Sequence, residues 1–135
     1  MADRASRLAA RTAARRARGA AARLSGRRQE ILAAVWLMLK GYRIIGFRLK
    51  TSEAEIDLLA QRGKVLAVVE VKSRQTLEAA LEAVTPAQRL RLLGAGRALA
   101  ARRPGLMRLN VRLDIVALAP GRRPRHIADA WRQED

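Results

Sequence analysis

Three short apolar runs that lie close together constrain the fold of this chain most strongly. They span residues 42–50, 54–60 and 65–72, and each is rich in Ile, Leu or Val. Only Arg62-Gly63-Lys64 and its immediate neighbours separate the last two runs, and a glycine in so short a link favours a tight hairpin turn. The sequence therefore predicts three neighbouring antiparallel strands.

A helix is predicted before these strands, over about residues 27–40. Its apolar residues recur at helical spacing, and they are Ile31, Leu32, Val35, Trp36 and Leu39. Gly41 follows where a left-handed helix cap belongs. We expect Trp36, on this apolar face, to be part of the core rather than a platform on which bases stack.

A second helix and a fourth strand follow the hairpin. Thr85-Pro86 supplies an N-cap and a proline suited to the first helical position, so the helix should run to about residue 102. Within it, Gly94 and Gly96 either weaken the helix or allow close packing. Residues 111–118 alternate in polarity, as strands do. The predicted order, α-β-β-β-α-β, indicates an α/β fold in which a small mixed sheet is flanked by helices.

The chain carries a large excess of positive charge. It has 28 Lys and Arg residues against 12 Asp and Glu residues, which gives a formal net charge of +16. Coding bias in a genome rich in G and C also raises the Arg content, but it does not by itself remove acidic residues. We therefore expect a polyanionic partner, and nucleic acid is the simplest one.

Composition divides the chain into three segments. Residues 1–25 are mainly Ala and Arg and predict a basic extension, disordered or a frayed helix, with an organelle transit peptide as the alternative. Residues 26–119 are the predicted domain. Residues 120–135 are a basic, loose tail, in which we expect His126 to lie at the surface.

The composition also indicates the cellular compartment in which we expect the protein. The absence of Cys excludes disulfides and thiolate zinc sites. The longest apolar run, Ile31 to Leu39, is too short to span a bilayer. We therefore expect a cytoplasmic protein without a membrane span.

Acidic residues are scarce, yet two clusters fall on neighbouring predicted strands. Side chains two positions apart share a face of a strand, so Glu55 and Asp57 point one way, and Glu70 and Lys72 do the same on the next strand. A hairpin through Gly63 brings Asp57 close to Glu70. Converging carboxylates repel each other unless a cation neutralises them, and their hard oxygen atoms suit Mg²⁺.

Such a pair could serve the hydrolysis of phosphodiesters. Lys72 would then orient an attacking water or stabilise negative charge that develops on a phosphate. The alternative is that Glu70 and Lys72 form only an ion pair at the edge of a strand.

The residues also resemble a known family. GYRIIGFRLKTSEAEIDLLAQRGKVLAVVEVKSR, followed by EAVTPAQRLRLL and VRLDIVAL, is similar to the YraN-like family of small uncharacterised bacterial proteins, over about residues 26–119. That family resembles Holliday-junction resolvases and other nucleases of the PD-(D/E)xK class. The resemblance implies a restriction-endonuclease-like fold, a Mg²⁺ or Mn²⁺ cofactor, and DNA as the partner. Because resolvases often act as dimers, it also favours a homodimer.

Carried over position by position, the resemblance implies four catalytic residues, Glu30, Asp57, Glu70 and Lys72. Asp57 and Glu70 would hold the metal. Glu30 has a competing explanation, since the helix dipole favours an acidic residue in a first turn. Asp114, in the last strand, is expected to pair with an arginine such as Arg112 or Arg74.

Four basic residues are candidate nucleic-acid contacts, namely Arg48, Lys50, Arg74 and Arg89. Two positions depart from the family pattern. Ala54 stands where the family has Gly, and Gln88 stands where a Lys usually follows Thr-Pro. The second change removes one phosphate contact that the family pattern would offer.

From these observations we expect a metal-dependent, endonuclease-like protein that hydrolyses phosphodiester bonds in DNA, including branched DNA. A first alternative is a non-catalytic nucleic-acid-binding protein that retains the nuclease fold. A second is an interaction protein that its Arg-rich extension anchors to a ribosome or to a membrane surface.

Overall fold

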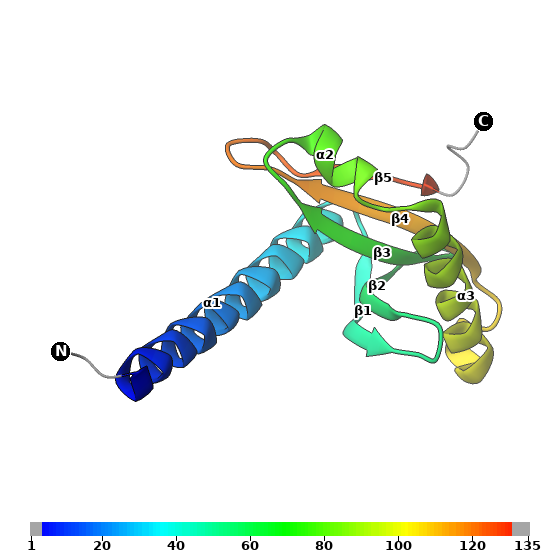
Figure 1. Cartoon of the computed structure of the whole chain (residues 1–135). Coiled ribbons are helices and arrows are strands. Elements are labelled where there is room, and N and C mark those ends of the chain that lie inside the picture. The colour runs from blue at the N-terminus through cyan, green and yellow to red at the C-terminus, as the bar shows by residue number, and fades with distance from the viewer. Residues whose placement is uncertain (1–3, 131–135) are drawn as a thin grey trace.

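Helices cover both faces of a five-stranded sheet, and one of them projects far beyond it (Figure 1). The computed structural model describes residues 4–130, with the side chains of residues 19–25 left aside. The elements are α1 (Arg4–Leu39), β1 (Arg43–Lys50), β2 (Glu55–Arg62), β3 (Val65–Ser73), α2 (Leu77–Glu82), α3 (Pro86–Arg102), the 3₁₀ helix η1 (Pro104–Leu106), β4 (Asn110–Leu118) and β5 (Arg125–Ile127).

The sheet is mixed, and its strands lie in chain order from β1 to β5. β3 and β4 are parallel, and the other neighbouring strands are antiparallel. The predicted hairpin is present, since Arg62 pairs with Val65 and Gly63 has a φ of 59°. The parallel pair needs a crossover connection, which α2 and α3 supply. The predicted α/β class and the three antiparallel strands are confirmed.

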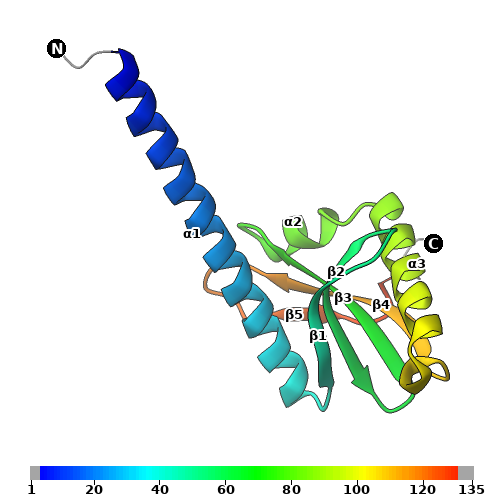
Figure 2. The same ribbon diagram turned by 90° about the horizontal axis from the view of Figure 1, so that it is seen from below.

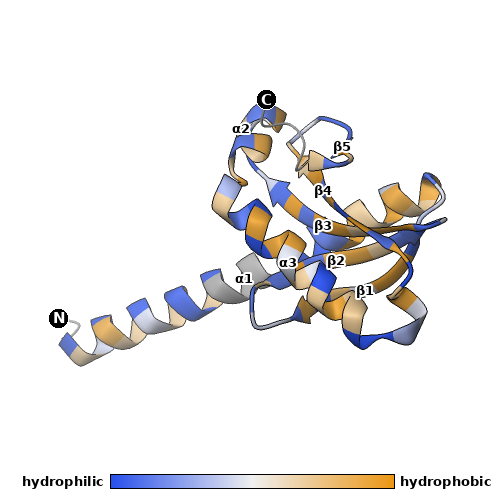
Figure 3. Cartoon of the chain, turned by 90° about the vertical axis from the view of Figure 1, so that its right-hand side faces the viewer, coloured by the Kyte–Doolittle hydropathy of each residue, from blue (hydrophilic) through white to orange (hydrophobic). Residues whose placement is uncertain are grey.

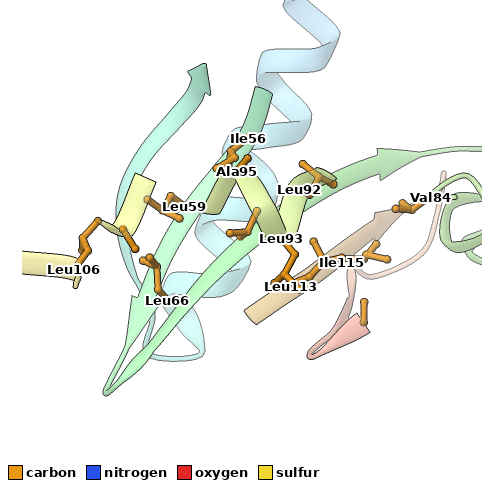
Figure 4. Packing of buried hydrophobic residues seen from close by; sticks show 13 residues of the cluster. Ile56, Leu59, Leu66, Val84, Leu92, Leu93, Ala95, Leu106, Leu113 and Ile115 are labelled. Carbon is orange, nitrogen blue, oxygen red and sulfur yellow. The ribbon is translucent and has the colours of Figure 1, made fainter. Parts of the chain in front are cut away.

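The sheet has an apolar layer on each face. α2 and α3 cover one face, and the C-terminal part of α1 covers the other, as Figure 2 shows. Figure 3 shows apolar residues concentrated on the strands, whereas polar residues recur along the projecting part of α1. On the α3 side the core includes Leu59, Leu93 and Ile115, and Figure 4 shows this cluster between α3 and the strands.

The predicted apolar face of the first helix was wrong. The side chains of α1 that pack on the sheet are those of Ala33, Ala34 and Leu37, whereas Ile31 and Val35 are exposed. Leu32 and Leu39 are exposed as well, and Trp36 is half-buried. Alanines let the helix lie close to the strands, and bulky residues on the same side would hold it away. The pattern of hydrophobicity therefore selected the wrong side.

The helix itself is longer than the predicted segment. α1 runs without a break from Arg4 to Leu39, so the predicted boundary at residue 25 falls inside it. The repeated alanines and arginines of this region are strong helix formers. The division of the chain into three segments stays a prediction. Among the residues that the structure describes, no helix is both long enough and apolar enough to cross a membrane.

Three elements were absent from the predicted order, namely α2, η1 and β5. α2 begins at an N-cap, Thr76, whose side chain accepts a hydrogen bond from the backbone N–H of Ala79. β5 lies in the segment that was expected to be a loose tail, and it pairs with β4 through Ile115 and Ile127, among others. All three elements are short, and their sequences lack a long periodic pattern.

The position expected for His126 was also wrong. Its side chain is only 2% exposed, and Nε2 donates to Asp114 Oδ2 at 2.7 Å. Asp114 is fully buried and also accepts two hydrogen bonds at 2.8 Å from Arg112, so its predicted pairing with an arginine is confirmed. The backbone N–H of Asp129 donates a further bond to Asp114. One buried carboxylate thus ties β5 and the turn after it to the centre of the sheet.

Close packing of α3 on the sheet depends on Gly96. An added Cβ there would overlap Val68 Cγ2 and lie 3.1 Å from Val111 Cγ1, whereas a Cβ at Gly94 would meet no heavy atom within 4 Å. We expect Gly96→Ala to lower the free energy of unfolding by about 1–3 kcal/mol through overpacking. The control, Gly94→Ala, should raise it by about 0.5–1 kcal/mol, because alanine favours the helix. Urea unfolding of both variants tests this; equal effects would contradict it.

Candidate metal centre

Asp57 and Glu70 lie on the neighbouring strands β2 and β3. The antiparallel ladder between these strands ends at the pair Leu58 and Val69, and Asp57 and Glu70 are the residues that come directly beyond this pair. A side-chain hydrogen bond joins the two carboxyl groups. The structure therefore brings together the two residues that the sequence analysis named as metal ligands.

Neighbouring groups hold both carboxyl groups in place. Asp57 Oδ2 accepts a hydrogen bond of 2.9 Å from the backbone N–H of Val71. Lys72 Nζ lies 3.5 Å from Glu70 Oε1, and both of these side chains are mostly buried. Lys72 therefore touches the acidic pair, as its place on the same face as Glu70 had indicated.

The surroundings of Glu70 disfavour its negatively charged form. Burial raises its pKa, the adjacent charge of Asp57 and the hydrogen bond to it raise the pKa further, and Lys72 offsets only part of this, so that the pKa reaches about 8. Near neutral pH, the pair of carboxyl groups therefore retains a proton, which lies in their shared hydrogen bond. A divalent cation bound between the two groups would take the place of this proton and neutralise both carboxylates.

Glu30 is tied to the site through Arg48. Glu30 is 8% exposed, and Arg48 Nε donates to its two oxygens at 2.6 and 3.0 Å. These bonds, and then the charges of Glu30, Glu55 and Asp57, raise the pKa of the Arg48 guanidinium. Arg48 is therefore bonded to Glu30 and is also attracted by the charges of Glu55 and Asp57.

The backbone of Arg48 is unusual for a strand residue. Its φ is 50°, in the left-handed region that side chains other than glycine seldom adopt. From this backbone position, the Arg48 guanidinium is bonded to Glu30. No local pattern in the sequence signals this conformation.

The other candidate nucleic-acid contacts are dispersed. Lys50 is exposed at the end of β1, and Arg74 is exposed after β3, where its Nη1 donates to the Ser73 carbonyl. Arg89 is half-buried, and its Nη1 donates to the carbonyl of Ala130. Their role in binding nucleic acid stays a prediction.

A pocket of about 270 Å³ opens beside Glu70, between the strands and α3. Its lining residues are Glu53, Ala54, Glu55, Glu70, Gln88, Arg91 and Leu92. Gln88 closes the capping box of α3, since its side chain accepts from the backbone N–H of Thr85. Arg91, which the sequence analysis did not single out, follows Gln88 at helical i, i+3 spacing and so reaches the same pocket.

The donor set fits a small divalent cation. Asp57 and Glu70 offer hard carboxylate oxygens, and Mg²⁺ commonly binds one or two carboxylates together with waters and substrate phosphates. No cluster of three or more His, Cys, Asp or Glu residues suited to a metal occurs within the described part of the chain. An ion bound by these two carboxylates alone would need further ligands from water or from a substrate.

The raised pKa of Glu70 predicts how stability varies with pH in the absence of metal. Between its ordinary value of 4.5 and about 8, the folded state binds more protons at Glu70 than the unfolded state does, so stability falls as the pH rises through this window. Glu70→Gln removes this loss. Between pH 5 and pH 9, the wild type should lose on the order of 1–3 kcal/mol more than the variant.

Urea unfolding of both proteins in EDTA checks this expectation. The comparison uses the difference between the two pH values, so the loss of the Lys72 contact in the variant cancels to a first approximation. Parallel pH profiles would show that Glu70 ionises as freely in the folded chain as in the unfolded one.

Comparison with known proteins finds relatives that match most of this chain. Residues 29–118 match the model of the uncharacterised protein family UPF0102. A UPF0102 protein of Caulobacter sp. (strain K31) is 70% identical over 121 residues, covering 90% of this chain and 87% of that protein. One from Caulobacter vibrioides (strain NA1000 / CB15N) is 67% identical, covering 87% of this chain and 94% of the relative.

The similarity extends to a more distant bacterium. A UPF0102 protein of Paramagnetospirillum magneticum is 52% identical over 116 residues, covering 83% of this chain and 90% of that protein. The matched residues include α3, the end of α1 and the strands β1 to β4. The chain therefore belongs to UPF0102, the YraN-like family that its sequence resembles.

Proposed function

We propose that this protein is a metal-dependent endonuclease that hydrolyses phosphodiester bonds in DNA, including branched DNA. The observation that carries the proposal is the contact between the carboxyl groups of Asp57 and Glu70, with Lys72 beside them, in a chain of net charge +16. A largely buried pair of carboxylates is costly unless a proton or a cation compensates its charge, and a metal ion can do this. Metal-assisted hydrolysis of a phosphodiester requires a cation beside the phosphate of the nucleic acid.

Each residue has a distinct role in the proposed reaction. Asp57, held by the Val71 N–H, and Glu70 would bind Mg²⁺ or Mn²⁺. When bound, the ion supplies Lewis-acid activation of the phosphate and a more acidic water. Lys72 orients the attacking water or stabilises the charge on the phosphate. Glu30 fixes the position of the Arg48 guanidinium, which can contact a neighbouring phosphate.

The projecting part of α1 supports a nucleic-acid partner. Its exposed arginines follow one another at three- and four-residue intervals, a spacing that places them along one side of the helix. They are Arg4, Arg7, Arg11, Arg15 and Arg18. Much of the remaining segment is alanine, which lacks the bulky apolar face that a membrane-binding helix inserts into lipid. A row of guanidinium groups suits a phosphate backbone.

Incubation of the full chain with a labelled four-way junction tests the proposal. We expect cleavage with Mg²⁺ or Mn²⁺ and none after EDTA is added. Cleavage that persists in EDTA would contradict the role given to the metal. Binding without cleavage in either metal would favour the non-catalytic nucleic-acid-binding protein.

A further inference from the structure

A second pocket lies close to the acidic pair, between α1 and β1. Its volume is about 340 Å³, and it is lined by Arg27, Glu30, Ile31, Phe47 and Arg48. The lining residues belong to α1 and β1, which run side by side in Figure 2. Most of its wall is apolar, and the proposed reaction makes no use of Phe47.

Phe47 is an unusual residue to find on this surface. It is the single phenylalanine in a chain with four aromatic residues, yet its side chain is 44% exposed. Ile31, across the pocket, is 56% exposed. Exposed apolar surface of this kind, enclosed by cationic side chains, is typical of a binding site rather than of a solvated face.

The residue after Phe47 gives the pocket a fixed shape. Arg48 adopts the left-handed conformation, and its Nε is held by both oxygens of the buried Glu30. Both bonds use Nε, so the rest of the guanidinium is positioned in the wall of the pocket. Arg48 thus combines a strained backbone with a guanidinium that is already held in position, and a ligand in the pocket can contact this guanidinium.

We propose that this pocket binds an unpaired nucleobase of the nucleic-acid substrate. The base stacks on Phe47, and Arg27 and Arg48 bind the phosphates on either side of it. Single-stranded nucleic acid is recognised by this combination of an aromatic face and cationic groups. A base within a duplex is stacked on both sides, so only an unpaired base can present a face to Phe47.

The position of the pocket relates it to the proposed catalytic site, on which this inference rests. Arg48 lines the pocket and also interacts with the charge of Asp57, so one residue connects the two sites. A nucleotide held here places its neighbouring phosphate toward the acidic pair. The inference therefore narrows the substrate to nucleic acid with an unpaired nucleotide beside the bond that is cut.

Charge favours this occupant over the others that an apolar pocket could accept. The wall has two arginines, and its one acidic residue, Glu30, is already bonded to Arg48. A second copy of a chain with a net charge of +16 would be repelled from it. A polyanion with a planar apolar part satisfies both components of the wall.

The test compares two DNA duplexes of equal length, one fully paired and one with a single unpaired nucleotide. Fluorescence anisotropy with the full chain in EDTA measures binding without cleavage. We expect the wild type to bind the second duplex about tenfold more tightly. Phe47→Ala should abolish that preference, and Phe47→Trp should retain it. Met107→Ala, which alters another apolar side chain with 60% exposure, is the control and should leave the preference unchanged.

Three outcomes would overturn the inference. The first is equal affinity of the wild type for the two duplexes. The second is a preference for the unpaired nucleotide that survives in Phe47→Ala. The third is a Phe47→Ala variant whose affinity falls by the same factor for both duplexes. Because the assay contains no metal, its result is independent of whether the protein cleaves DNA. If the protein prefers the unpaired nucleotide but does not cut DNA, the result supports the inferred base-binding pocket and contradicts the proposed nuclease activity.

Discussion

Asp57→Asn is expected to lower the rate of metal-dependent DNA cleavage by on the order of a thousandfold. Asparagine keeps the shape of the side chain, and its carbonyl oxygen can still accept the hydrogen bond from Val71. It removes the negative charge that would hold the ion. The fold should be preserved, because neither the size of the side chain nor its hydrogen bond with Val71 changes.

The loss should lie in catalysis and not in DNA binding. Removing a negative charge from a DNA-binding protein does not weaken its attraction to phosphates, so affinity in EDTA should be equal or higher. Glu78→Gln is the matched control, since it makes the same chemical class of change at an exposed acidic residue of α2. Undiminished cleavage by Asp57→Asn would remove the main support for the proposed function.

Asp114→Asn is expected to lower the free energy of unfolding by about 3–5 kcal/mol at pH 7. Burial raises the pKa of Asp114, but hydrogen bonds from His126, Arg112 and the Asp129 backbone outweigh it, and the pKa lies below its ordinary value. The carboxylate is therefore stabilised in its charged form. An amide cannot replace it, because the amide nitrogen would face groups that also donate.

The pH dependence of this effect follows from the lowered pKa. The contribution of Asp114 is fully present above the unfolded value and is lost as the pH falls through the folded one, so the two proteins should become more alike in strong acid. Urea unfolding across this range measures the difference. Glu82→Gln, at an exposed residue of α2, is the control. Equal stability of Asp114→Asn and the wild type at pH 7 would contradict the structural role.

The sequence was sufficient to predict features that depend on local chemistry. Gly63 indicated the hairpin turn, and Thr85-Pro86 indicated the start of α3, because both rest on neighbouring residues alone. The hairpin in turn fixed the register, which is why the approach of Asp57 to Glu70 could be predicted before the structure was known.

Features that depend on distant residues could not be predicted. β5 is three residues long, and its place depends on His126 meeting a carboxylate on β4. The side of α1 that faces the sheet depends on how closely the helix can approach, which alanines at 33 and 34 decide. Arginine is not a residue type that indicates a left-handed backbone position, so the conformation of Arg48 could not be predicted. The pocket next to Phe47 forms only when α1 and β1 meet.

The proposed nuclease activity requires Asp57 and Glu70 to share a divalent cation, and calorimetric titration with Mn²⁺ measures this most directly. Since the pKa of Glu70 is about 8, binding near pH 7 should release close to one proton, which shows as a heat that varies with the ionisation enthalpy of the buffer. We predict binding to the wild type and its loss in Asp57→Asn. Absence of Mn²⁺ binding to the wild type, or undiminished Mn²⁺ binding to the variant, would contradict the proposed metal site at Asp57 and Glu70.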